Sequence, residues 1–188
     1  MPVKKISKSE IIEKSLEVFR QQGFYHTSMA DLAMACGLYK GSFYHYFDSK
    51  ETLMKEVLEG VDFYLRNKIY PIAYETDLSP YDRLEKLLKK FSKTVFNPDY
   101  GCLIGNISLE TATLIPEFRV ILQSIFTGWS ENLTYLYAHN HPPEIAKKLA
   151  EQTIMEYEGA VMMSKVLGNT EYFKDCYERA LERMSSNT

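Results

Sequence analysis

The stretch from Lys40 to Lys50 combines residue types that rarely serve one structural purpose, and several of them could bind a ligand. Its sequence is KGSFYHYFDSK. Lys40, His45 and Lys50 carry N–H donors that a fully buried segment would not contain. Phe43 and Phe47 stand four residues apart, so in a helix they share one side and can anchor it to a core. The pattern predicts a short helix with an aromatic inner face and an outer face of hydrogen-bond donors.

The rest of the chain offers no set of residues typical of catalysis or metal binding. The sequence has no Ser/His/Asp set, phosphate-binding glycine loop or Cys/His metal motif with suitable spacing. Glu110, Glu156 and Glu158 have no plausible partners for acid–base work. The spacing of His139 and His141 could hold a metal, but no carboxylate or cysteine accompanies them, which favours a solvated loop. The sequence therefore predicts a binding protein that needs no cofactor and is not an enzyme.

The composition is typical of an ordinary globular protein of the cytoplasm. The chain has 188 residues, of which 45% are hydrophobic and 25% are charged. Its apolar runs are far shorter than the ~20 residues that span a bilayer, so no membrane association is expected. Three widely spaced cysteines, Cys36, Cys102 and Cys176, form no disulfide framework, which favours a reducing compartment.

Charge is distributed unevenly along the chain. The formal net charge is −3, yet residues 1–50 hold seven Lys or Arg against five Asp or Glu. Part of this basic excess gathers at Lys4, Lys5 and Lys8. A small positive module on an acidic body is compatible with DNA contact at one end.

Helical periodicity runs through the N-terminal part of the chain, and alternating strand patterns are absent. The pattern predicts a helix over 8–22 that ends at Gly23, a short helix capped by Ser28, one over 40–46, and one capped by Asp48. Short helices joined by a tight turn containing glycine form a helix-turn-helix. Such a unit places its second helix in the major groove of DNA.

The C-terminal part is also predicted to be helical. A Ser79-Pro80 pair opens a helix there, and further helices are expected over 103–114, 117–138, 144–167 and from the cap at Thr170 to about 184. Loops are expected at 97–101 and 139–143. The whole pattern predicts an all-α fold of about nine helices in two groups.

The segment from Ile11 to Leu58 resembles the DNA-binding domain of the TetR family of bacterial transcriptional regulators. The matching residues include Phe19, Gly23, Thr27-Ser28-Met29, Gly37-Leu38, Lys40 to Phe47 and Ser49 to Leu53. The resemblance implies a helix-turn-helix DNA-binding domain at residues 1–50 and a ligand-binding and dimerisation domain at residues 51–188. It implies a ligand-responsive homodimer, a repressor that leaves a palindromic operator when a small molecule binds.

The resemblance also implies which residues contact DNA. They are Thr27, Ser28, Tyr39, Lys40, Gly41, Ser42, Tyr44, His45 and Lys50. Lys50 is expected at a backbone phosphate and His45 near the base edges. Tyr39 departs from the Ser or Thr usual in the family, so it cannot cap the recognition helix through a short hydroxyl. Either the helix start frays or is capped by another group, or the Tyr39 phenol binds a phosphate or base.

The expected effector site is rich in aromatic and apolar residues. The segment from Tyr100 to Asn106, with Glu110, is similar to one that lies beside the ligand cavity in a subgroup of these regulators. The predicted lining is Phe96, Cys102, Ile104, Asn106, Glu110, Phe126, Trp129, Tyr157 and Met163. Such a lining favours an aromatic or lipophilic molecule oriented by one or two hydrogen bonds. Glu110 is either a polar anchor of this site or a surface residue.

The last two helices are the candidates for the homodimer interface. The helix over 144–167 becomes apolar nearly all round after Ile154, which is typical of a helix between two surfaces. The final helix carries Phe173, Cys176 or Tyr177, Ala180 and Met184 at roughly heptad spacing. Packing inside one subunit is the alternative for both patterns. For the whole protein, the alternative is a helix-turn-helix that binds a protein partner and not an operator.

Overall fold

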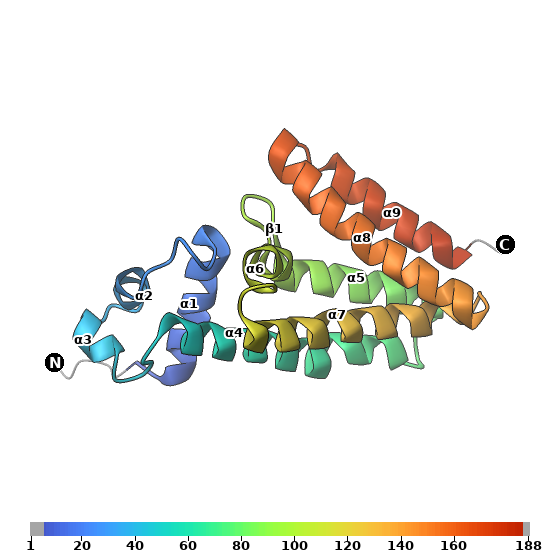
Figure 1. Cartoon of the computed structure of the whole chain (residues 1–188). Coiled ribbons are helices and arrows are strands. Elements are labelled where there is room, and N and C mark those ends of the chain that lie inside the picture. The colour runs from blue at the N-terminus through green and yellow to red at the C-terminus, as the bar shows by residue number, and fades with distance from the viewer. Residues whose placement is uncertain (1–5, 186–188) are drawn as a thin grey trace. The chain divides into compact units, whose positions relative to one another are not determined.

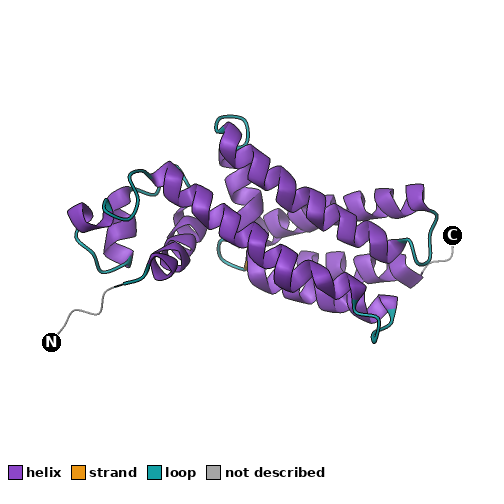
Figure 2. Ribbon diagram, turned by 90° about the horizontal axis from the view of Figure 1, so that it is seen from below, coloured by secondary structure: helices purple, strands orange, loops and turns teal. Residues whose placement is uncertain are grey.

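The computed structural model describes residues 6–185, and helices account for most of them (Figure 2). The predicted all-α fold is confirmed, with nine α-helices in the described part of the chain. Lys4 and Lys5 of the basic N-terminal cluster lie outside it. The helices are α1 (Lys8–Gln22), α2 (Met29–Ala35), α3 (Lys40–Phe43), α4 (Lys50–Tyr64), α5 (Pro80–Val95), α6 (Leu103–Thr111), α7 (Pro116–Tyr137), α8 (Pro143–Leu167) and α9 (Glu171–Ser185).

The chain forms two compact units, which are described separately. The first contains the described part of Met1–Val61 together with Asn106–Leu122. The second contains Asp62–Gly105 and the described part of Gln123–Thr188. The N-terminal helices α1, α2 and α3 therefore share their unit with a later stretch taken from α6 and α7.

Local sequence signals set the helix starts of the first unit. Ser28 and Asp31 form the predicted capping box at α2, in which Ser28 Oγ accepts from the Asp31 amide at 3.2 Å. An equivalent box at α1 pairs Ser7 with Glu10. At α4 the expected cap was wrong by one residue, because the Thr52 amide donates to Ser49 Oγ at 3.0 Å.

The recognition region has the buried aromatic anchor that the sequence predicts. Phe43 and Phe47 are both buried, and their ring centroids lie 6.4 Å apart. The helix α3 ends at Phe43, three residues earlier than expected. Beyond it the amides of His45 and Tyr46 donate to the carbonyls of Ser42 and Phe43, three residues back. The tighter turn replaces α-helical bonding there.

The second unit contains two features that the sequence pattern did not predict. The expected loop at 97–101 is a small hairpin, in which β1 (Phe96–Asn97) pairs antiparallel with β2 (Gly101–Cys102). The Asn97 side chain accepts from the amides of Asp99 and Tyr100 and so closes the turn. After α4 the backbone continues as a π-helical turn, Leu65–Ile69, and a 3-10 turn, Tyr70–Tyr74.

The stripe on α9 that was expected at the dimer interface packs inside the subunit. Cys176, Ala180 and Met184 are buried, and α9 lies beside α8 and α5 (Figure 1). Hydrogen bonds also hold α9 to neighbouring helices. Tyr137 Oη donates to the Ala180 carbonyl at 2.9 Å, and Tyr177 Oη donates to the Glu85 carbonyl at 3.1 Å. The heptad-like spacing therefore reflects internal packing.

The loop before α8 differs from the expected solvated segment at one residue. His141 is buried and its Nε2 lies 2.6 Å from the Arg183 carbonyl. The neighbouring Asn140 Nδ2 donates to the Met184 carbonyl. This loop therefore supplies donors to carbonyls in the last turn of α9, which have no partner within the helix.

Candidate functional site

The outer face of the helix-turn-helix is built from exposed donors around a short helix. Tyr39 is 88% exposed, and Lys40, Gly41, Ser42, Tyr44 and His45 are also exposed. Tyr39 occupies the N-cap position of α3 and makes no side-chain cap, so its phenol is not used by the helix. The buried side chains of Phe43 and Phe47 anchor this segment to the core. Its outer face presents one ammonium, one imidazole and several hydroxyl groups to solvent.

The two residues before α2 have separate roles. Ser28 is exposed, and its hydroxyl both accepts from the Asp31 amide and donates to Asp31 Oδ2 at 2.6 Å. These hydrogen bonds from Ser28 lower the pKa of the Asp31 carboxyl. Thr27 is buried, and its hydroxyl donates to the Gly23 carbonyl at 2.6 Å. The Thr27 side chain thus supports the turn and is not presented to a ligand.

The Lys50 ammonium, expected at a phosphate, contacts the protein itself. Its Nζ donates to the Phe24 carbonyl at 2.7 Å and lies 4.3 Å from the centroid of the Phe24 ring. The Tyr25 ring centroid lies 6.0 Å from the same atom. A cation over an aromatic face is attracted by the ring quadrupole. The Lys50 side chain is half-buried in this position.

Glu110, expected either as an effector anchor or as a surface residue, is half-buried and contacts this segment. Its Oε2 accepts from the Phe24 amide at 2.8 Å and the Tyr25 amide at 3.0 Å. Gly23 has φ 76° and leaves space for the carboxylate, since a Cβ there would lie 2.3 Å from Glu110 Oε1. The carboxylate is therefore engaged by two backbone amides of the first unit.

In the second unit, an aromatic cluster gathers four of the residues predicted to bind the effector. Trp129 is fully buried, and its ring lies 4.0 Å from that of Phe91, 5.1 Å from Tyr157 and 6.1 Å from Phe126. Phe96 joins it through Phe173, on which it stacks at 4.5 Å and which contacts Tyr157. Phe91 and Phe173 were not predicted to join this cluster, because their periodicity is that of ordinary core residues.

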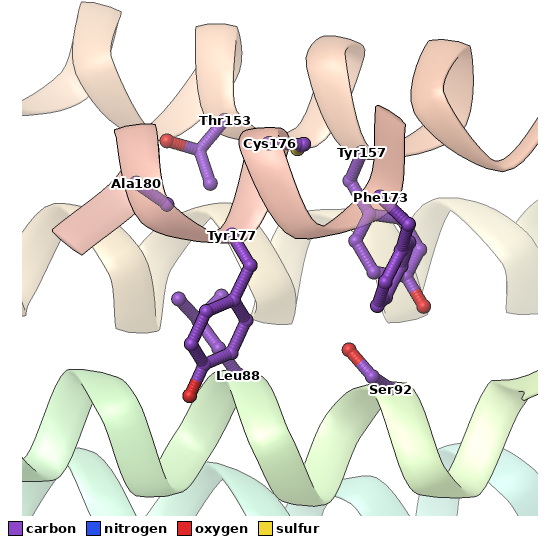
Figure 3. Close-up of a pocket in the computed structure, with 8 residues that line it drawn as sticks. All are labelled: Leu88, Ser92, Thr153, Tyr157, Phe173, Cys176, Tyr177 and Ala180. Atoms are coloured by element: carbon purple, nitrogen blue, oxygen red, sulfur yellow. The ribbon is translucent and has the colours of Figure 1, made fainter. Parts of the chain in front are cut away.

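A small cavity of about 10 Å³ borders this cluster between α5, α8 and α9 (Figure 3). Among the predicted effector residues, Tyr157 lines it. Burial raises the pKa of the Tyr157 phenol well above its usual value, and its oxygen has no hydrogen-bond partner among the described residues. The cavity has room for about one water molecule. Its lining is Leu88, Ser92, Thr153, Tyr157, Phe173, Cys176, Tyr177 and Ala180.

A buried thiol and a largely buried carboxyl group meet in the same unit. Burial raises the pKa of both Cys102 and Glu158, and the nearby Glu158 carboxylate raises that of the Cys102 thiol further. Glu158 Oε1 has no hydrogen-bond partner among the described residues. Gly105 makes room for this carboxyl, because a Cβ would lie 2.2 Å from Glu158 Oε2. No spacing in the sequence signals this role of Glu158, which stands directly before the apolar run of α8.

The remaining predicted effector residues differ in burial and in the unit to which they belong. Ile104 is fully buried, whereas Met163 is 38% exposed on α8. Asn106 and Glu110 belong to the first unit, and the other predicted effector residues belong to the second. Within residues 6–185, no group of His, Cys, Asp and Glu is arranged to hold a metal ion. Nor is any helix in that range both long and apolar enough to cross a bilayer.

Comparison with known families agrees with this architecture in both parts of the chain. Residues 11–57 match the model described as bacterial regulatory proteins, tetR family. Residues 80–179, more than half of the chain, match the model described as transcriptional regulator LmrA/YxaF-like, C-terminal domain. The chain belongs to the TetR family. It is a DNA-binding transcriptional regulator of the ligand-responsive kind typical of that family.

Similar proteins cover most of its length. The chain is 27% identical over 170 residues to the HTH-type transcriptional repressor DhaR of Mycobacterium sp. strain GP1, covering 87% of this chain and 85% of DhaR. It is 24% identical to the transcriptional regulator AcuR of Cereibacter sphaeroides, covering 88% and 79%. A TetR transcriptional regulator from Legionella pneumophila has the same fold, with a TM-score of 0.85 and 20% identity over 97% of this chain and 98% of that one.

Proposed function

We propose that the chain is a repressor that binds a palindromic operator as a homodimer and releases it when a small molecule binds the second unit. The observation that carries this proposal is the row of exposed donors on α3, held on buried Phe43 and Phe47. The name of the related DhaR, a transcriptional repressor, supports repression over activation. The protein would act in the cytoplasm, where bacterial DNA lies, and without catalysis.

In this proposal the residues of the recognition surface divide the work. Lys40 neutralises a phosphate with its exposed ammonium, and Gly41 beside it has no side chain to keep the DNA backbone at a distance. His45 and Tyr44 face base edges from the end of α3, with Ser42 beside them. The exposed phenol of Tyr39 and the exposed hydroxyl of Ser28 contact the sugar–phosphate backbone on either side.

The homodimer would form through the last two helices, with α8 supplying the apolar part. Met155, Met162 and Val166 are 64%, 59% and 73% exposed and lie on one face of α8. Gly159 shares that face, and a Cβ there would meet no atom within 4 Å. The outer side of α9 is polar, with exposed Lys174, Glu178 and Arg179, and would form the rim.

The effector would bind at the aromatic cluster of the second unit. Trp129, Phe126, Phe96 and Tyr157 supply apolar surface there, and buried Cys102 lies in the same unit. Such surroundings favour an aromatic or lipophilic molecule with one or two polar groups. Because the cavity is only about 10 Å³, binding would require the surrounding side chains to move apart. The ligand acts only through a difference in its affinity for the two states.

The test is selection of bound sequences from random DNA, followed by titration of the selected site and sedimentation of the complex. The proposal expects an enriched palindrome and two chains per site. Met162→Glu should weaken dimer formation and operator binding together, whereas Glu178→Lys at the polar rim should change both less. Failure to enrich any sequence would favour the alternative, a helix-turn-helix that binds a protein partner.

A further inference from the structure

The segment between α1 and α2 has its backbone held by two charged side chains from distant parts of the first unit. We propose that Glu110 and Lys50 are positioning residues for DNA binding, which act by fixing the backbone of Phe24 and Tyr25. On this assignment Lys50 does not neutralise a DNA phosphate. The inference rests on the proposed operator binding but assigns residues that neither the family comparison nor the sequence placed in this role.

Three backbone groups in this segment are paired by side chains. The amides of Phe24 and Tyr25 donate to one oxygen of Glu110, which lies 86 and 85 residues further along the chain. The Phe24 carbonyl accepts from the Lys50 ammonium, 26 residues away. A carboxylate on amides and an ammonium on a carbonyl are charge-assisted hydrogen bonds, roughly twice as strong as neutral ones.

The Phe24 side chain is fixed as firmly as its backbone. It is 1% exposed, and its ring lies 5.4 Å from Phe118 in an edge-to-face arrangement and 6.2 Å from Phe19. The Lys50 ammonium covers the Phe24 ring at 4.3 Å. Helices α1, α4, α6 and α7 of the first unit therefore all contact this one residue. A segment held from so many elements has little freedom to shift.

The position of this segment determines where α2 begins. Thr27 is bonded to the start of the turn, through its hydroxyl to the Gly23 carbonyl and through its amide to the Phe24 carbonyl. Ser28, the N-cap of α2, follows at once. A displaced Phe24–Tyr25 backbone would therefore displace the start of the helix-turn-helix. The effect on DNA binding would not be confined to one base position, since neither Glu110 nor Lys50 contacts a base in this proposal.

Lys50 can be distinguished from a phosphate-binding lysine by the salt dependence of binding. Neutralising one phosphate contributes about one unit to the slope of log K against log salt. A lysine that acts through the protein backbone contributes to affinity but not to that slope. The matched comparison is Lys40, which is exposed and is assigned to a phosphate. Lys55, on the same helix as Lys50 and paired with Glu59 at 3.9 Å, is the control.

The experiment measures the affinity of the full-length protein for its selected operator at several salt concentrations. Lys50→Ala and Glu110→Ala should each weaken binding roughly tenfold without changing the salt slope, the size expected for losing a charge-assisted hydrogen bond. Glu110→Gln keeps an acceptor for both amides and should recover most of the loss. The double variant should lose less than the two single losses combined, since both residues act on one segment. Lys55→Ala should behave as wild type.

Hydrogen exchange of the folded protein provides a second readout. In wild type the Phe24 and Tyr25 amides should be protected, and Glu110→Ala should raise their exchange about tenfold while Trp129 fluorescence stays unchanged. The inference is overturned if Lys50→Ala flattens the slope by about one unit. It is also overturned if these amides exchange freely in wild type, or if Glu110→Ala binds DNA normally. If wild type selects no operator, the proposed function fails instead. The exchange measurement then still tests whether Glu110 pairs with the Phe24 and Tyr25 amides.

Discussion

The helix-turn-helix and the aromatic core of the second unit differ in how far their polar groups are paired by hydrogen bonds. Around α2, Ser28 and Asp31 pair with each other, and Glu110 pairs with two backbone amides. In the second unit, Trp129 Nε1 and Glu158 Oε1 are buried and have no hydrogen-bond partner among the described residues. The polar groups around the start of α2 are thus paired, although Ser15 Oγ in α1 is buried without a hydrogen-bond partner among the described residues. The second unit carries buried polar atoms whose pairing would favour a bound ligand or a rearranged state.

The largest effect should come from truncating the centre of the second unit. Trp129→Ala removes a fully buried ring that packs on Phe91 and Tyr157, so we expect a loss of about 3–5 kcal/mol in the free energy of unfolding. Denaturant unfolding followed by circular dichroism measures it. Leu109→Ala is the control, because Leu109 is 89% exposed and should change stability little.

Trp129→Phe sharpens the same comparison. It keeps much of the apolar contact and removes the N–H that has no partner among the described residues. The loss should therefore be much smaller than that of Trp129→Ala, because deleting an unpaired buried donor removes a desolvation cost. An equal loss for the two substitutions would show that the indole N–H is well paired in solution.

A smaller effect is expected where local pairing sets a helix start. Ser28→Ala removes the N-cap of α2 and should cost about 1 kcal/mol, or roughly 2–4 °C in melting temperature. Hydrogen exchange should rise in α2, while the fluorescence of Trp129 at the same temperature stays as in wild type. Ser9→Ala serves as the control, since Ser9 is exposed inside α1. Equal losses for the two variants would remove the special role of the cap.

Glu158→Gln should have an effect that depends on pH. Burial raises the pKa of the Glu158 carboxyl, so the folded chain keeps a proton that the unfolded chain releases above about pH 4.3. Stability due to this group is thus full at lower pH and falls as pH rises through the raised folded value. The substitution should raise the melting temperature at about pH 8 and change it little at about pH 4. A gain confined to acid pH would contradict the assigned direction.

The features that the sequence predicted well are those encoded over a few residues. The capping box at Ser28, the end of α1 at Gly23 and the buried pair Phe43 and Phe47 all depend on spacings of three to five residues. The features that it missed depend on residues far apart in the chain. The contact of Glu110 with Phe24 spans 86 residues, and no periodicity signals such a contact.

The stripe on α9 shows the limit of periodicity in another way. Cys176, Ala180 and Met184 repeat as an interface would, yet the same spacing suits any helix packed on two neighbours. The sequence of α8 predicts a helix that lies between two surfaces, and in the structure some of its apolar side chains are exposed. Only the three-dimensional structure separates the face of a helix that is already covered from the face that a second subunit could cover.

The most direct test of the central claim, that the α3 surface reads DNA, is to titrate Lys40→Ala and His45→Ala against a panel of operator mutants at several salt concentrations. Lys40→Ala should lower affinity equally across sequences and flatten the salt slope by about one unit. His45→Ala should leave the slope nearly unchanged and relax the preference at one position of each half-site, at a cost of about 1–3 kcal/mol. Full operator affinity and unaltered sequence preference in both variants would contradict the claim.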